Sequence, residues 1–345
     1  MSPKTFLALL AVTAVSVVGA GYAVVSKSRS EAAPAAANAP LFPDLLAQAN
    51  SVGEVTVVTA KGKATIRRDG ERWLIAEKDG YPVPVDKLRK LVGGLAGLRL
   101  LEAKTDQPDR YARLEVEDVT QKDAKSRLVT LAGADGKTLA SLIVGKRNYD
   151  MGMTGPGGLY IRQPSEARSW LAEGALEVPE APIDWPDRTV VDVAADGVAR
   201  VAFQPTGGAA LTATKADRMV KNLTLAAIPE GKAADPDAVN RLATVFAGLT
   251  FDDVRKDALP ADATPKATAE VATFDGLTAR AALFDVGGTV WARLTATGTA
   301  GSEGEKQAKA INDRVAGWLY KLPDYKIPML QPKIDDLLKK SDGTS

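Results

Sequence analysis

The chain has 345 residues, 45% of them hydrophobic and 25% charged, which is typical of globular proteins and enough for two domains with separate cores. Its formal net charge is +1, but Lys4, Lys27 and Arg29 precede residue 31, so the remainder carries 41 basic and 43 acidic groups, a net charge of −2. No domain-wide basic excess exists, and we expect no nucleic-acid partner. The absence of Cys and His excludes disulfides, thiolate nucleophiles, Ser-His-Asp triads and the usual zinc sites. We therefore expect no metal and no cofactor.

An uncharged run of 20 residues, from Phe6 to Val25, dominates the N-terminus. As a helix it would span roughly 30 Å, the thickness of a bilayer core. We predict a transmembrane anchor within residues 1–28; the alternative is a cleaved signal peptide, with Ala20 or Ala23 at the cleavage site. The residues expected to face lipid are Phe6, Leu7, Leu9, Leu10, Val12, Val15, Val17, Val18, Tyr22, Val24 and Val25.

The short segment before this run favours export of the body that follows it. We expect a single-pass protein of a bacterial inner membrane with its soluble body in the periplasm. Residues 29–40 read as an Ala/Pro linker without side chains able to build a core.

The body contains one stretch twice. Asp86 to Glu102 recurs, shifted by 151 residues, at Asp237 to Asp253. Each copy predicts a helix with an acidic start, a glycine near its end and a strand directly afterwards. We predict an α+β fold of two tandem repeats, 41–180 and 183–325, followed by a tail, 326–345. Each repeat is expected to be a mostly antiparallel meander sheet packed by one or two helices.

In the first repeat, alternation and turns predict three strands between Val55 and Ala76 and a hairpin from Arg127 to Val144. Leu88, Leu91, Val92 and Leu95 follow a helical spacing that would cover one face of the sheet. A short helix is expected at Ser165 to Leu171.

In the second repeat, a helix is expected near Pro236 to Ala247 and a meander from Thr268 to Thr295. Glu303 to Leu322 reads as an amphipathic helix, with Ile311, Val315, Trp318, Leu319 and Leu322 on one stripe. Core packing and docking to a partner both explain that stripe.

The segment Met151 to Gly158 is glycine-rich, but it lacks the Gly-x-Gly-x-x-Gly spacing of a phosphate-binding loop and a following Lys-Ser/Thr. A flexible hairpin loop is the simplest interpretation. Its methionines, Met151 and Met153, could form a contact surface, as could Trp318 and Tyr325.

Carboxylates are the remaining candidates for catalysis. Glycosidases work with pairs of them, and Asp252-Asp253 and the group Glu115, Glu117 and Asp118 offer such residues. Clusters of this kind more often lie on solvated surfaces or cap helices, so we expect no catalytic residue and no enzyme.

Several short motifs together resemble the family named domain of unknown function 4340. They include Trp73 with Ala76-Glu77, Lys104-Thr105, Arg110 to Leu114, Ile143 to Arg147, Trp185 to Thr189 and Ile228 to Gly231. The resemblance covers most of residues 41–256. It implies an exported, membrane-anchored protein without assigned catalytic residues, associated with ABC-2-type transporters and gliding-motility-type auxiliary subunits.

These observations predict a non-catalytic accessory or interaction protein, held at the inner membrane by its N-terminal helix and partnered with the permease or auxiliary subunits of an ABC-2-type transporter. A periplasmic module that binds lipid or glycan is the alternative. A carboxylate-dependent hydrolase is the third hypothesis.

Overall fold

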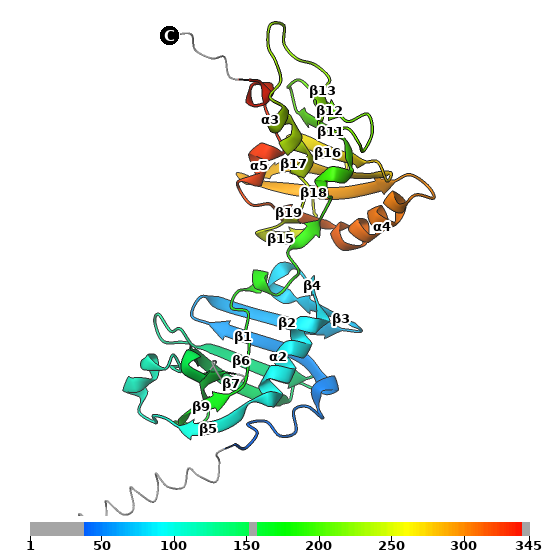
Figure 1. Cartoon of the computed structure of the whole chain (residues 1–345). Helices are drawn as coiled ribbons and strands as arrows, with labels where there is room; N and C mark the ends of the chain where they lie inside the picture. The colour runs from blue at the N-terminus through cyan, green and yellow to red at the C-terminus, as the bar shows by residue number, and fades with distance from the viewer. Residues whose placement is uncertain (1–37, 152–156, 340–345) are drawn as a thin grey trace, which may run out of the picture. The chain divides into compact units, whose positions relative to one another are not determined.

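The computed structural model describes residues 38–151 and 157–339, and the chain divides into two compact units (Figure 1). The first comprises Met1–Glu77 and Val83–Pro182, and the second Lys78–Pro82 and Ile183–Ser345. Both are mostly antiparallel sheet with few helices, as the α+β prediction requires. Within the described ranges no helix is long and apolar enough to cross a membrane. The predicted anchor, Phe6 to Val25, lies outside those ranges.

The first unit is built on one sheet with the strand order β4-β3-β2-β1-β6-β7-β8-β9-β5. The three strands and the hairpin predicted from alternation are confirmed as β1 to β3 and as β6 with β7. The bounds are β1 (Val52–Thr59), β2 (Gly62–Asp69), β3 (Arg72–Ile75), β4 (Tyr81–Val83), β5 (Arg99–Ala103), β6 (Arg127–Gly133), β7 (Thr138–Asn148), β8 (Gly158–Arg162) and β9 (Ser169–Glu173).

The helix predicted in this unit is α2 (Val85–Gly97), which lies across one face of the sheet (Figure 1). Pro84 precedes its first turn, where a missing backbone N–H costs nothing, and Asp86 complements the dipole. The four apolar residues of the predicted stripe, Leu88, Leu91, Val92 and Leu95, are all buried. The helical spacing therefore identified the packed face correctly.

The segment before β1 extends the free edge of β5. Pro40 pairs antiparallel with Arg99, and the N–H of Leu41 donates to the carbonyl of Leu98 at 2.9 Å. Leu45, a few residues on, is buried. Residues 38–40 form the end of the predicted Ala/Pro linker, and their backbone adds to the sheet. An edge strand offers unpaired N–H and C=O groups to any adjacent extended chain.

The second unit has the strand order β13-β12-β11-β16-β17-β18-β19-β15, which matches that of the first sheet strand for strand from β3 to β5, without a counterpart of β4. The bounds are β10 (Thr189–Val191), β11 (Val198–Pro205), β12 (Leu211–Thr214), β13 (Thr224–Leu225), β14 (Leu249–Thr250), β15 (Asp253–Lys256), β16 (Ala267–Thr273), β17 (Leu277–Val286), β18 (Thr289–Gly298) and β19 (Trp318–Lys321). β10 and β14 form a separate pair.

Two predicted helices are wrong in whole or in part. The expected helix from Glu303 to Leu322 is α4 (Glu303–Val315) followed by β19, because Gly317 takes a left-handed φ of 80° that ends the helix. The expected helix from Ser165 to Leu171 is a turn leading into β9, whose residues pair with both β8 and β5. Local periodicity could not reveal those distant partners.

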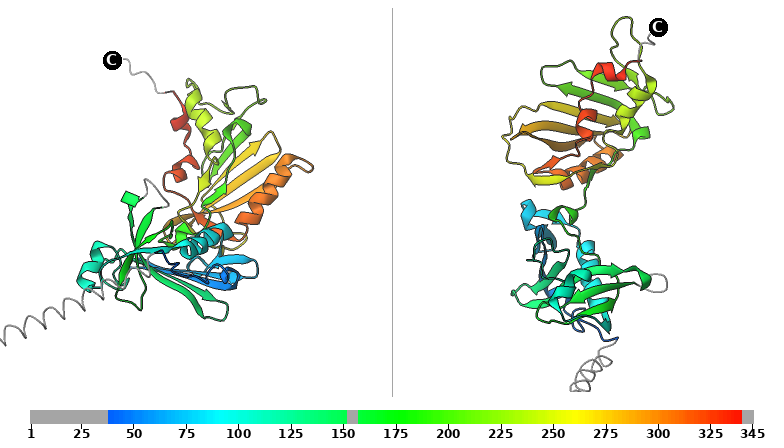
Figure 2. Two further views of the ribbon diagram at one scale, coloured as in Figure 1. Left: turned by 60° about the horizontal axis from the view of Figure 1, so that its bottom comes forward. Right: turned by 90° about the vertical axis from the view of Figure 1, so that its left-hand side faces the viewer.

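The second copy of the repeated helix is shorter than the first. α3 (Pro236–Arg241) starts at Asp235, whose carboxylate caps two backbone N–H groups, and tightens into a 3₁₀ turn at Leu242–Thr244. Residues 326–339 of the tail pack against this unit (Figure 2): α5 (Lys326–Met329) precedes the buried Leu330, and the N–H of Asp235 donates to the carbonyl of Leu337 at 2.8 Å.

Neighbouring glycines in α2 provide a test of its packing. A Cβ at Gly94 would lie 2.9 Å from the carbonyl oxygen of Ala175, whereas one at Gly93 would meet nothing within 4 Å. We expect Gly94→Ala to destabilise the first unit by about 1–3 kcal/mol through overpacking. Gly93→Ala should stabilise it by about 0.5–1 kcal/mol through helix propensity. Urea unfolding of both variants checks this, and shifts of the same sign would contradict it.

Candidate functional site

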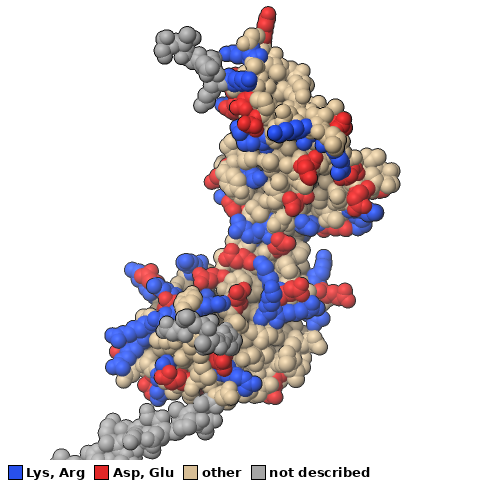
Figure 3. All heavy atoms as spheres, in the orientation of Figure 1, with Lys and Arg blue, Asp and Glu red and all other residues tan. Residues whose placement is uncertain are grey.

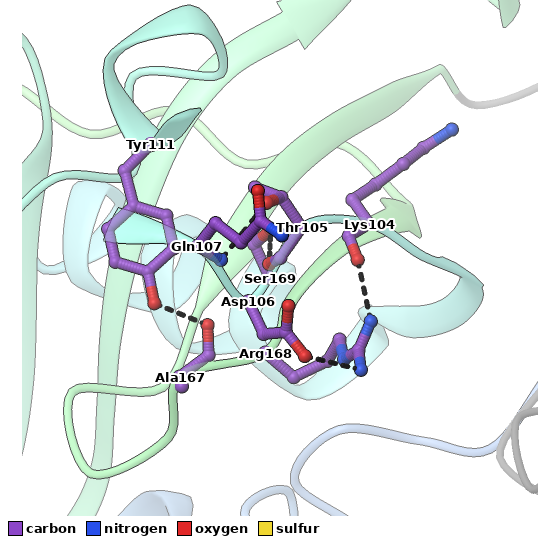
Figure 4. Close-up of polar contacts among 8 residues, drawn as sticks. All are labelled: Lys104, Thr105, Asp106, Gln107, Tyr111, Ala167, Arg168 and Ser169. Carbon is purple, nitrogen blue, oxygen red and sulfur yellow. Dashed lines mark hydrogen bonds and ion pairs between the residues drawn. The ribbon is translucent and has the colours of Figure 1, made fainter. Parts of the chain in front are cut away.

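The most elaborate polar region of the first unit is the β5–β6 loop, residues 104–126. Figure 4 shows how its start is tied to β9. The guanidinium of Arg168 donates to the carbonyl of Lys104 at 2.9 Å and pairs with the carboxylate of Asp106 at 2.7 Å. The hydroxyl of Ser169 donates to the carbonyl of Thr105 at 2.7 Å. These bonds fix the point where the loop leaves the sheet.

A buried arginine on β8 holds the middle of this loop. The Nε of Arg162 donates to the carbonyl of Val116 at 2.9 Å, and its Nη2 pairs with Asp118. Its guanidinium also lies 4.6 Å from the ring centroid of Tyr111, whose hydroxyl donates to the carbonyl of Ala167. The side chain of Arg162 is only 5% exposed, so its charge depends on these partners.

The second unit repeats this arrangement on β18. Arg293 donates to both carboxylate oxygens of Asp257, at 2.5 and 2.9 Å, and to the carbonyl of Leu259. Its guanidinium lies 5.0 Å from the ring centroid of Phe284. β8 and β18 occupy equivalent places in the two sheets. The arginine on each of them binds the chain segment directly after β5 in the first unit and directly after β15 in the second. We name Arg162 and Arg293 the clamp arginines.

The pKa of Asp257 reflects this contact. Burial of the carboxyl acts to raise the pKa, but the hydrogen bonds from Arg293 and from the backbone N–H of Leu259, with the nearby positive charge, lower it below its usual value. Asp257 is therefore held in its charged form.

The carboxylates considered for catalysis in the first unit have structural partners. The Oε1 of Glu117 accepts from the backbone N–H of Lys125 at 2.6 Å, and Glu115 lies 4.0 Å from the ammonium of Lys125. Asp118 belongs to the clamp of Arg162. Glu117 is buried, and its Oε2 has no hydrogen-bond partner within the described part of the chain. The structure gives these three residues different roles rather than one shared site.

Asp252 and Asp253 also have different structural partners. Asp252 pairs with Arg188 at 2.7 Å, while Arg188 also donates to the carbonyl of Phe251. Asp253 accepts from the backbone N–H of Val254 at 2.7 Å and begins β15. Residues 38–151 and 157–339 contain no group of three or more acidic, His or Cys side chains able to hold a metal ion.

The residues predicted as a contact surface have different surroundings. Tyr325 is 66% exposed, whereas Trp318 is 7% exposed, with the ammonium of Lys256 4.0 Å from its ring centroid. Trp318 thus packs in the core of the second unit, and its proposed place on a contact surface is corrected. Met151 is half-buried, and Met153 lies outside the described residues.

A concave site of about 660 Å³ opens beside the second half of α2, and we name it the α2 pocket. Gly93, Gly94 and Gly97 present backbone on its helical side. The charged residues that line it are Lys90, Arg99, Arg147, Glu173 and Glu177. Sequence reasoning missed this site, because its charges come from one helix, three strands and a loop and follow no local motif.

The second unit has an apolar groove of about 600 Å³ beside the start of β12. Its walls are mainly Ala, Pro, Leu and Ile side chains, with Lys333 as its charged residue; they include Pro205, Leu211, Ile228, Pro229, Pro332 and Ile334. Ile228 is 42% exposed. Elsewhere on the visible face, basic and acidic side chains are interspersed, without a one-sign patch (Figure 3).

The fold and these sites define a tandem α+β protein whose strongest polar clusters stabilise loops. The family model named Domain of unknown function (DUF4340) matches residues 73–271, which is more than half of the chain. The chain belongs to this family. No curated protein matches the chain.

The clamp of Arg162 can be tested against a nearby exposed arginine. We expect Arg162→Met to destabilise the first unit by about 2–3 kcal/mol, because it leaves the carbonyl of Val116 without its charged donor. Arg168→Met, at a side chain 41% exposed, should cost less than about 1 kcal/mol. Chemical denaturation measures both, and equal losses would contradict a special role for Arg162.

The clamp of Arg293 should be visible in the pH dependence of stability. Because the folded pKa of Asp257 is lowered, the stability it contributes is present above its unfolded pKa of about 3.9 and lost as the pH falls through the folded value. We expect Asp257→Asn to cost about 1–3 kcal/mol at pH 7 and progressively less below about pH 4. Asp262→Asn, at an exposed position in the same linker, is the control. A pH-independent difference in unfolding free energy would contradict this.

Proposed function

We propose that this protein is a non-catalytic accessory or interaction protein, tethered by its N-terminal segment to a bacterial inner membrane with its body in the periplasm. The observation that carries the proposal is the attachment of residues 38–41 to β5. A tether arriving at residue 38 would join the body at a fixed place on a sheet edge, secured by backbone hydrogen bonds and by the buried Leu45. Such a junction suits a body held in a defined position at the membrane.

The paired architecture supports a role in assembly. We propose that the two units are copies of one repeat, since they share the strand order and the clamp arginine. The carboxylates that could have served a hydrolase instead accept hydrogen bonds from Arg188, Arg162 and backbone amides. The partnership with an ABC-2-type transporter comes from what the family resemblance implies.

A ligand-binding module is the second candidate, and the apolar groove of the second unit favours it. Its volume of about 600 Å³ lies within the range of small-molecule sites. Its Pro, Ala, Leu and Ile lining would suit an apolar group better than a glycan, which needs several hydrogen-bonding side chains.

The proposed partnership predicts a defined complex. Full-length protein purified by affinity from gently solubilised membranes should bring down an ABC permease and its ATPase, identified by mass spectrometry. A variant that starts at residue 29 separates partners held by the anchor from partners held by the body. Recovery of the protein alone, in several detergents, would contradict the proposal.

Protease protection in spheroplasts tests the orientation, and a cytoplasmic body would overturn the localisation.

A further inference from the structure

We propose that the α2 pocket binds a zwitterionic phosphodiester headgroup that carries a primary ammonium, as in phosphatidylethanolamine. The proposal rests on the proposed function, because tethering is what would bring this pocket to lipid headgroups. It is carried by the charges that line the pocket, by the backbone that forms its helical side and by the place where the tether meets the body.

The pocket brings both signs of charge together from distant parts of the chain. Lys90 comes from α2, Arg99 from the start of β5 and Arg147 from β7. Glu173, at the end of β9, pairs in register with Arg99 on β5. Within the described part of the chain, the side chains of Lys90 and Glu173 have no ion pair or hydrogen bond. A ligand with one negative and one positive group would satisfy both.

The basic residues of the pocket suit a phosphodiester. Arg99 and Arg147 are already oriented by bonds to the carbonyls of Asn38, at 3.0 Å, and Leu176, at 3.2 Å. Arg147 also lies 3.9 Å from the carboxylate of Glu177. Each guanidinium still has further N–H donors beyond these contacts, and Lys90 adds an ammonium. Arginine and lysine donors of this kind form charge-assisted hydrogen bonds to phosphate oxygens.

The acidic residues of the pocket suit a primary ammonium. Glu173 supplies a carboxylate without an ion pair among the described residues, whereas Glu177 lies 3.9 Å from the guanidinium of Arg147. The pocket also lies along the second half of α2, whose C-terminal carbonyls carry partial negative charge. A quaternary ammonium has no N–H to donate and is recognised by aromatic rings. The described residues that line this pocket include no aromatic side chain. We therefore expect ethanolamine to be preferred over choline.

The glycines allow a ligand to approach the helix backbone closely. Cβ atoms built at Gly93 and Gly97 meet nothing within 4 Å, so that space is open to a ligand. The same fact gives a blocking variant that should fold: a leucine at position 93 would project into free space and favour the helix.

The tether brings the membrane within reach. Asn38, whose carbonyl binds the pocket residue Arg99, is the first described residue of the chain. If residues 6–25 span the bilayer, the 12 residues from 26 to 37 extend at most about 40 Å. The pocket would then lie close enough to the bilayer surface to meet headgroups.

The test uses full-length protein in detergent micelles and measures binding of short-chain phosphatidylethanolamine, phosphatidylcholine and phosphatidylglycerol. We expect phosphatidylethanolamine to bind at least tenfold more tightly than the other two. Lys90→Ala and Glu173→Gln should each weaken it about tenfold, which corresponds to the loss of one charge-assisted hydrogen bond. Gly93→Leu should abolish binding with an unchanged or higher melting temperature. Lys122→Ala, at an exposed residue of the β5–β6 loop, is the matched control.

Glycerophosphoethanolamine, the free headgroup, distinguishes the two sources of this ligand. If the free headgroup binds more weakly than phosphatidylethanolamine, the natural ligand is a lipid. If the two bind equally well, the pocket still binds this headgroup, but the proposal that it binds a membrane lipid is contradicted. Equal affinity for all three lipids, or normal binding by Gly93→Leu, would overturn the proposal. Co-purification of a transporter with Lys90→Ala would show that the accessory role stands even where lipid binding fails.

Discussion

In each sheet, the strand that follows the helix pairs with the last strand of the meander and forms the far edge. The rest of the structure depends on this long-range pairing. β5 pairs with β9, with Arg99 opposite Glu173, and β15 pairs with β19, with Asp253 opposite Lys321. Roughly 70 residues separate the paired strands in each case, so chain entropy opposes this contact until the intervening meander is in place. Because β5 must return to the far edge of the sheet, α2 is drawn across one face. The same closure leaves the outer edge of β5 for residues 38–41.

The clamp arginines show how one architecture accommodates two different insertions. In the first unit the β5–β6 loop is long and wraps over β7 and β8, where Gly145 is required because a Cβ would lie 2.3 Å from the carbonyl of Leu114. In the second unit the equivalent linker is short, and α4 is inserted between β18 and β19 instead. Arg162 and Arg293 nevertheless bind the chain directly after the closing strand. For Arg162, whose side chain is only 5% exposed, displacement of that segment would leave a buried charge without its partners. The side chain of Arg293 is 24% exposed, so the corresponding cost is smaller.

How far the sequence predicted this protein depends on the distance between interacting residues. The stripe from Leu88 to Leu95 is local, and it identified both α2 and its buried face. The apparent continuation of α4 to Leu322 failed because Trp318 is buried by strand pairing, which gives the same apolar signal as a helix stripe. The carboxylate Asp118 pairs with Arg162, which stood outside any motif because the two residues are 44 positions apart. The α2 pocket was unpredictable for the same reason.

The surroundings of the charged side chains also bear on function. Several carboxylates that could have served catalysis fix the geometry of loops instead: Asp118 and Asp252 pair with arginines, and Glu117 accepts from a backbone amide. At Asp257 the arginine contact holds the pKa low, whereas a general acid needs a raised pKa and a cleft to work in. The α2 pocket differs, because Lys90 and Glu173 lie in one concavity with no mutual ion pair among the described contacts. These charges lie near Asn38, where the proposed tether would meet the body, and they suit recognition of a ligand of mixed charge.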